Sequence, residues 1–201
     1  TLAEEPLTMQ VMTFDGKSGY VELPQNIFDN VTEGTVEVWV KWTKFNKWSR
    51  VFDFGIENRA FVVQTEKNKN SVNYRIWEKK RRDHKIQAKK KLRQGVWHHI
   101  VAVFGRSGMA FYLDGQLIGT NAFEGGLDVA AGGNNYIGKS NWPKDKLFQG
   151  AMTEFRVWNR RLSPEEILRI KDRTLVGDED GLIGYWRLGD AADGEVPSGL
   201  D

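Results

Sequence analysis

The 201-residue sequence predicts an all-β fold: a two-sheet antiparallel β-sandwich with one short helix near residues 163–171. Three observations lead to this prediction. Apolar and polar residues alternate in many short segments, at a spacing of roughly 8–12 residues that is typical of strands. The 21 glycines suit the many tight turns that such strands need. Only one segment carries the start signals of a helix.

Three segments show how the strands are read. Residues 35–42 (TVEVWVKW) are apolar at every even position, whereas Glu37 lies on the opposite face. Residues 96–105 (VWHHIVAVFG) are apolar on both faces over their second half, which predicts a central strand covered on both sides. In residues 109–119 (MAFYLDGQLIG), the Asp-Gly pair between two apolar runs predicts a hairpin, because a type I′ turn needs positive φ at both positions.

The predicted helix and the strand before it lie near the C-terminal end. Ser163 is a suitable N-cap, Pro164 fits the first helical position, and a glutamate follows three residues after the cap. Before them, residues 151–159 (AMTEFRVWN) alternate, with Arg156 facing away from the core. If this strand neighbours residues 35–42, the charges of Arg156 and Glu37 pair across the two strands.

Basic charge is concentrated in one segment. The net charge is +2, yet residues 79–93 (KKRRDHKIQAKKKLR) hold nine Lys/Arg against one Asp. We expect two strands here, joined by a charged turn at residues 81–83, with residues 85, 87, 89 and 91 on one face. Such a patch suits a polyanion or an acidic protein, or protects an edge strand from pairing. Its residues are Lys79, Lys80, Arg81, Arg82, Lys85, Lys89 and Lys91.

Five segments together resemble a known family, the laminin G-like jelly-roll domains of the concanavalin A-like lectin/glucanase superfamily. They are FDGKSGYVELP, GTVEVWVKW, GVWHHIVAVF, AFYLDGQLIG and YIGKSNWPKDKLFQGAMTEFRVWNRRLSPEEI. The resemblance implies two antiparallel sheets of six or seven strands, with the terminal strands side by side. It places one domain at residues 1–175. Residues 176–201 are then either a closing strand plus tail or the start of a following repeat.

Several function classes are disfavoured. Hydrolysis on the resembled fold uses a Glu-x-Asp-x-x-Glu strand motif, which this sequence lacks, so we expect no enzyme activity. Without cysteine there is no disulfide framework and no thiolate metal site. No apolar run approaches the ~20 residues that span a membrane. Nucleic acid is a weaker hypothesis than a glycan or an acidic protein, because no stacking motif interleaves the basic residues.

Aromatic side chains are the candidate ligand-binding groups. Sugars stack on exposed aromatic rings and form hydrogen bonds with polar side chains at loop rims. We expect such a site to use Trp48, Arg50, Trp77, Asn141, Trp142 and Asp145. Trp142 has an alternative role as an anchor that packs its own loop.

The resemblance also implies one structural Ca²⁺ and a cellular location for the protein. The ion's ligands would correspond to Asp15 and Glu154, although the family more often has Asp-Glu where this chain has Thr153-Glu154. It favours an extracellular or cell-surface protein. A chain that begins at Thr1 rather than Met predicts a larger multidomain protein, whose other domains are partners.

The sequence thus predicts a non-catalytic recognition module that binds a carbohydrate. The alternative is a protein–protein interaction or assembly module, with the basic hairpin 79–93 contacting an acidic partner or a polyanion.

Overall fold

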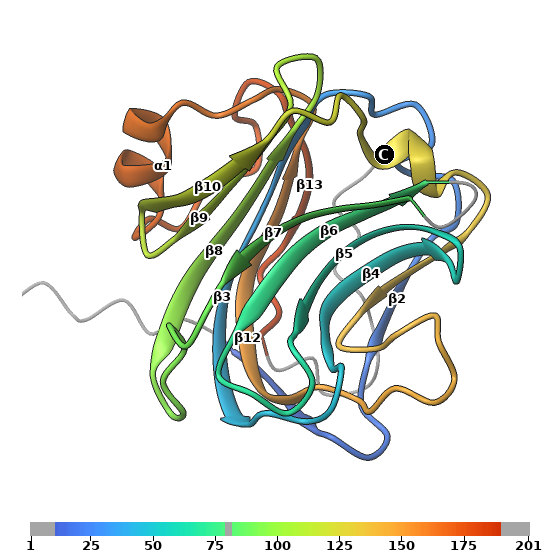
Figure 1. Ribbon diagram of the computed structural model, residues 1–201. Helices are drawn as coiled ribbons and strands as arrows, with labels where there is room; N and C mark the ends of the chain where they lie inside the picture. The colour runs from blue at the N-terminus through green and yellow to red at the C-terminus, as the bar shows by residue number, and fades with distance from the viewer. Residues whose placement is uncertain (1–10, 79–81, 190–201) are drawn as a thin grey trace, which may run out of the picture.

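The computed structural model describes residues 11–78 and 82–189, which form two sheets packed face to face with one α-helix outside them (Figure 1). The seven-stranded sheet contains β1 (Met12–Asp15), β3 (Gly34–Lys44), β8 (Trp97–Phe104), β9 (Met109–Leu113), β10 (Gln116–Asn121), β12 (Gln149–Trp158) and β13 (Leu182–Trp186). The six-stranded sheet contains β2 (Val21–Leu23), β4 (Arg50–Ile56), β5 (Arg59–Thr65), β6 (Val72–Glu78), β7 (Arg82–Ala88) and β11 (Asn134–Ile137). The helix α1 spans Pro164–Ile170, and a short 3₁₀ helix spans Leu127–Ala130.

The order of the strands confirms the predicted antiparallel sandwich. The larger sheet runs β1-β12-β3-β8-β9-β10 with β13 paired to β12, and the smaller runs β2-β11-β4-β5-β6-β7. Neighbouring strands pair antiparallel throughout both sheets. No helix among the described residues is long and apolar enough to cross a membrane.

Aromatic rings from both sheets fill the space between them. Phe52 of β4 meets Phe155 of β12 edge-on at a centroid distance of 5.6 Å. Phe61 of β5 meets Phe104 of β8 at 5.0 Å. All four side chains are fully buried. Because the inner faces are apolar and interdigitate, the alternation of each strand directs its polar residues to the outer faces.

The outer face of the seven-stranded sheet carries a second, smaller apolar cluster. Val101 and Val103 of β8 point away from the main core and are buried with Trp158 and with Ile167 of α1. This covering explains why β8 is apolar on both faces, as predicted. The helix that provides part of the cover starts where its signals indicate, with both hydrogen bonds of the capping box formed at Ser163.

Glu37 and Arg156 pair across β3 and β12, as predicted. Their Cα positions are partners in the register, and Arg156 Nη1 lies 3.3 Å from Glu37 Oε1. Trp158 Nε1 donates to the same oxygen at 3.0 Å, and His99 Nε2 lies 2.9 Å from Glu37 Oε2. Burial alone would raise the pKa of Glu37, but these partners hold it below its ordinary value.

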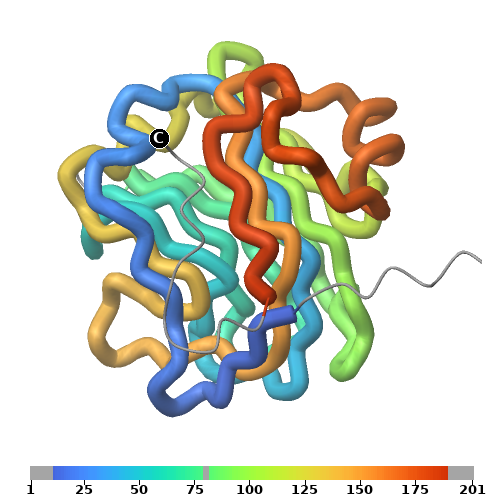
Figure 2. Tube along the Cα trace, turned by 180° about the vertical axis from the view of Figure 1, so that it is seen from behind, coloured from blue at the N-terminus to red at the C-terminus, as the bar shows by residue number. Residues whose placement is uncertain are grey.

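The two ends of the described chain meet on one edge of β12. Met12 of β1 pairs with Met152, and Trp186 of β13 pairs with Phe155. Seen from behind, β13 runs beside β12 (Figure 2). Residues 182–186 are therefore a strand of this sheet.

Candidate functional site

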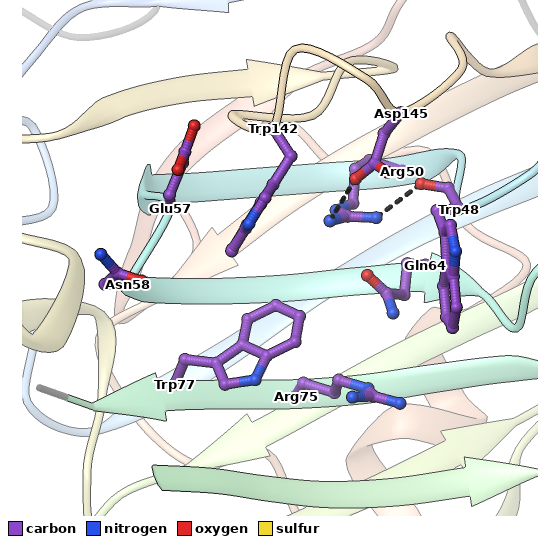
Figure 3. A pocket seen from close by; sticks show the side chains of 9 residues that line it. All are labelled: Trp48, Arg50, Glu57, Asn58, Gln64, Arg75, Trp77, Trp142 and Asp145. Atoms are coloured by element: carbon purple, nitrogen blue, oxygen red, sulfur yellow. Dashed lines mark hydrogen bonds and ion pairs between the residues drawn. The ribbon is translucent and has the colours of Figure 1, made fainter. Parts of the chain in front are cut away.

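A pocket of about 410 Å³ opens on the outer face of the six-stranded sheet (Figure 3). Its lining residues are Trp48, Arg50, Glu57, Asn58, Gln64, Arg75, Trp77, Trp142 and Asp145. Five of the six residues predicted to bind a ligand are among them, although they come from three separate parts of the chain. The sixth, Asn141, does not line the pocket. The volume lies in the range of small-molecule sites, which is about 300–1,000 Å³.

The floor of the pocket is formed by Gln64 of β5 and by Arg75 and Trp77 of β6. Val63 and Ile76, their neighbours in the chain, lie in the main core. Because successive side chains of a strand point to opposite faces, the three floor residues face outward. The aligned pairing of β5 with β6 then places them side by side.

Two tryptophans from loops stand over this floor. Trp142 packs on Trp77 with ring centroids 5.0 Å apart, and Figure 3 shows Trp48 on the other side of the pocket. Trp48 has φ of 55°, which is a left-handed conformation that strains a bulky residue. Its N–H donates to the Lys67 carbonyl at 3.1 Å, and its own carbonyl accepts from Arg50 Nη1 at 2.5 Å. These bonds hold the strained backbone in place.

The loop that carries Trp142 is attached to the sheet through Asp53 of β4. This fully buried carboxylate accepts from the Asn141 N–H at 3.1 Å, from Asn141 Nδ2 at 2.9 Å and from Arg50 Nε at 2.9 Å. Burial raises the pKa of Asp53, and the Arg50 charge and the Asn141 bonds oppose that rise. Asn141 therefore anchors the loop to β4. This attachment helps to fix Trp142, the next residue in the chain, over the pocket.

Both arginines at the pocket are held by acidic partners. Arg50 pairs with Asp53 and with Asp145, each at 2.9 Å, and its side chain is 3% exposed. On β6, Arg75 has a similar arrangement. It pairs with Asp83 at 2.9 Å and with a second carboxylate, that of Glu66, at 3.4 Å.

Some polar groups at the pocket have no partner in the described part of the chain. Gln64 is 2% exposed, and its Oε1 makes no hydrogen bond. Arg75 Nε is also buried and unpaired. Glu57 and Asn58, in the turn between β4 and β5, are exposed, and no hydrogen bond or ion pair of their side chains is found among these residues. The two buried atoms are not accessible to a ligand, whereas the exposed side chains of Glu57 and Asn58 can form hydrogen bonds with one.

Sequence reasoning missed four of these lining residues. Arg75 could have been found, because it precedes Trp77 by two positions and so shares its strand face. Gln64, Glu57 and Asn58 had no such signal, since their approach to the pocket depends on the pairing of β5 with β4 and with β6.

The basic segment departs from the strand and turn that the sequence predicted for it. Its first three residues, Lys79, Lys80 and Arg81, lie outside the described residues. Arg82 begins β7 instead of forming the turn, and it pairs with Glu78 at 3.2 Å.

The second half of the segment leaves the strand. β7 ends at Ala88, because Lys90 adopts a positive φ of 53° and its N–H donates to Ser71 Oγ at 2.9 Å. Of the four residues expected on one strand face, Lys85 and Gln87 are in β7, whereas Lys89 and Lys91 lie beyond it. Arg82 and Ala88 are about 20 Å apart at the usual rise of a strand. Among the described residues of the segment, Arg82 and the lysines after Ala88 therefore lie at opposite ends of β7, with Lys85 between them.

Four loops form a basic surface at the end where β7 stops. Backbone hydrogen bonds connect them: Trp48 N–H to the Lys67 carbonyl, Lys146 N–H to the Lys47 carbonyl, and Leu92 N–H to the Asn70 carbonyl, at 3.1–3.2 Å. We call this surface the basic rim, and its exposed residues are Lys47, Lys67, Lys69, Lys89, Lys90, Lys91, Arg93 and Lys146. The rim borders the pocket, because the loops that hold Trp48 and Asp145 belong to both.

The carboxylate of Asp15 accepts hydrogen bonds within the turn that follows it. It accepts from the backbone N–H groups of Ser18, Lys17 and Gly19, which lower its pKa, and also from the Ser18 hydroxyl. Asp15 pairs with Gln149 at the first residue of β12.

Glu154, the second predicted calcium ligand, lies elsewhere and is also engaged. It sits in a bulge of β12 with φ of 54°, where it accepts from Arg156 Nη2 at 2.5 Å and from the Tyr185 hydroxyl at 2.6 Å. Glu154 follows Gln149, the partner of Asp15, by five positions along β12, which is about 16 Å at the rise of a strand. The shared Ca²⁺ that the resemblance implied at these two residues stays a prediction. Among the described residues, no group of three or more His, Cys, Asp or Glu side chains is placed to hold a metal ion.

A second pocket of about 380 Å³ lies on the outer face of the seven-stranded sheet. Trp39 and Trp97 line it. Trp39 Nε1 donates to the Lys171 carbonyl at 2.6 Å, and Lys41 Nζ lies 5.0 Å from the centre of the Trp97 ring. Trp39 thus fastens the segment after α1 to the sheet, which is a structural role.

Comparison with known proteins agrees with this architecture. The family Laminin_G_3, described as the concanavalin A-like lectin/glucanases superfamily, matches residues 15–168. The chain belongs to this superfamily. A search of curated proteins found no match for this member.

Solved structures of low sequence identity share its fold. One is the CBM40 of Ruminococcus gnavus IT-sialidase bound to α2,3 sialyllactose, with TM-score 0.68, 15% identity, and coverage of 80% of this chain and 96% of that one. A putative carbohydrate binding protein from Bacteroides ovatus has TM-score 0.72 and 15% identity, covering 93% of this chain and 54% of that one. Domain 4 of an extracellular arabinanase from Geobacillus stearothermophilus, in complex with arabinotriose, has TM-score 0.62 and 17% identity, covering 78% and 74%.

Proposed function

We propose that this chain is a non-catalytic carbohydrate-binding module and that its sugar binds in the pocket of Trp48, Trp77 and Trp142. The observation that carries this proposal is the combination of three loop and strand tryptophans with exposed polar side chains, those of Glu57 and Asn58, that have no partner in the described part of the chain. A sugar has one part that matches the tryptophan rings and another that matches the polar groups. Its C–H face packs on an aromatic ring, and its hydroxyl groups form hydrogen bonds with side chains at the edge of that ring.

Two structural neighbours support the ligand class. The Ruminococcus gnavus module is bound to α2,3 sialyllactose, and the Geobacillus stearothermophilus domain is in complex with arabinotriose. Because the identities are 15% and 17%, the neighbours support a glycan in general and not a particular sugar.

The carboxylates of the pocket support binding without hydrolysis. Glycoside hydrolysis needs two carboxyl groups about 5–10 Å apart on either side of the scissile bond, one of which must be free to give up a proton. Of the two acids that line the pocket, Asp145 is engaged by Arg50 and by the Ser140 hydroxyl. Glu57 is the remaining acid of the lining. A single free carboxylate suits a hydrogen bond to a hydroxyl group.

The test is calorimetric titration of variants with a glycan selected on an array. Trp142→Ala should weaken binding about 30-fold, because truncation of a central aromatic contact costs about 2 kcal/mol. Trp77→Ala should have a similar effect. Trp97→Ala, on the opposite sheet, is the matched control and should bind as the unaltered protein does. Equal weakening in the control, or no glycan bound at all, would contradict the proposal.

A second candidate function is polyanion binding by the basic rim. Its four loops contain two acidic residues, Glu66 and Asp145, and both are already paired with arginines. Lys89, Lys90 and Lys91 lie beyond β7, so protection of that edge strand does not account for them. A sulfated or acidic chain could neutralise this surface with release of counterions, and binding would then fall steeply with salt.

A further inference from the structure

The pocket offers no free cation to an acidic ligand. Arg50 and Arg75 are the only basic residues that line it, within the part of the chain that the structure describes. Two carboxylates hold each of them. The acids around these arginines, counted with Glu57 of the lining, outnumber them by five to two.

The accessible groups of the lining that have no partner among the described residues include both acceptors and donors. Glu57 presents a carboxylate, and Asn58 presents an amide that both accepts and donates. The indole N–H groups of Trp48, Trp77 and Trp142 are further donors. A ligand rich in hydroxyl groups matches this set, because each hydroxyl can donate to an acceptor and accept from a donor.

An anionic sugar fits poorly in this lining. Its carboxylate or sulfate would face Glu57, which repels it, and both arginines are already paired with carboxylates. To obtain two parallel hydrogen bonds from Arg75, it would have to displace Asp83 or Glu66, which would leave that residue without its partner.

We propose that the sugar unit seated in this pocket is uncharged, an inference that rests on the pocket being a glycan site. The lysines of the basic rim do not alter it, since none of them lines the pocket. They can attract an acidic portion of the same glycan outside the pocket at low salt. At high salt, where the charges of the basic rim are screened, the measured binding reflects the preference of the pocket itself for neutral or acidic sugars.

The experiment is a glycan array probed with the full chain in about 0.1 M and about 0.5 M salt, where screening shortens from ~10 Å to a few ångströms. Neutral gluco-, manno-, xylo- and arabino-oligosaccharides are printed beside uronic, sulfated and sialylated ones, with lactose beside sialyllactose. We expect neutral ligands to be retained in high salt and acidic ligands to lose at least about tenfold. An acidic glycan that binds in high salt when its neutral core does not would overturn the inference and leave the glycan site intact. Absence of all glycan binding would remove both.

A second variant tests the charge argument directly. Asp83→Asn releases Arg75 Nη1 while it keeps the size of the side chain, and Asp83 is only partly buried, at 34% side-chain exposure. We expect affinity for acidic oligosaccharides in high salt to rise about tenfold, the value of one added charge-assisted hydrogen bond, and neutral affinity to change less than about twofold. Asp172→Asn, with the same change of charge at the pocket outside the opposite sheet, is the control. If acidic binding does not rise above the control, the arginine pairing does not set the specificity.

Discussion

Asp53→Asn is the change that links the stability of the chain to the geometry of its pocket. The carboxylate of Asp53 receives Arg50 Nε and two hydrogen bonds from Asn141, and all of its surface is buried. An asparagine of the same shape removes the charge and turns an N–H₂ group toward one of these donors. The loop then loses its attachment to β4 next to Trp142.

The loss of stability expected for Asp53→Asn depends on the ion pair that Arg50 keeps. Removing one partner of a buried ion pair costs about 3–5 kcal/mol. Arg50 keeps Asp145 at 2.9 Å, so we expect the lower end, about 3 kcal/mol. In a chain of this length, each kcal/mol lowers Tm by about 2–4 °C, which predicts a fall of about 6–12 °C.

Urea unfolding and calorimetry measure this stability, and titration with the selected glycan measures the site. We expect glycan affinity to fall well below that of the unaltered protein at a temperature where both remain folded, because Trp142 is no longer held over Trp77. A variant within about 0.5 kcal/mol of the unaltered protein, with unchanged affinity, would refute the role of Asp53 as the anchor.

Three further predictions concern other parts of the chain. Glu37→Gln should lower the free energy of unfolding by about 3 kcal/mol at pH 7, because it removes one partner of a buried ion pair. Because the pKa of Glu37 is lowered on folding, its contribution is present above the ordinary value of 4.5 and is lost as pH falls further, so urea midpoints of the two proteins should converge in acid. Changing Lys89, Lys90 and Lys91 to Glu should abolish retention on a heparin column with little change in Tm, and persistent retention would exclude the rim. Ser163→Ala should cost about 1 kcal/mol through loss of the helix cap, and an unchanged unfolding curve would contradict that role.

Local patterns predicted much of the fold. The alternation of β3, β8 and β12, the cap at Ser163 and the turn at Asp114 each depend on residues adjacent in sequence, and the structure confirms all of them. The turn shows the reason most directly, since Asp114 and Gly115 take positive φ values of 54° and 79°.

The basic segment shows where local patterns failed. Alternation predicted one face through Lys91, yet the strand ends at Ala88 because a side chain from another strand connection, that of Ser71, captures the Lys90 N–H. No feature of residues 79–93 predicts the hydrogen bond with Ser71.

The amino-acid order alone was sufficient for the sandwich, its turns, its helix and the tryptophans that could meet a sugar, because burial and backbone conformation act over a few neighbouring residues. Only the folded chain decided that Trp48, Trp77 and Trp142 share one pocket and that both of its arginines are already neutralised. Those facts depend on strand register and on contacts such as Asp53 with Asn141, between residues far apart in sequence. Pairing of this kind is set by the packing of the whole sandwich.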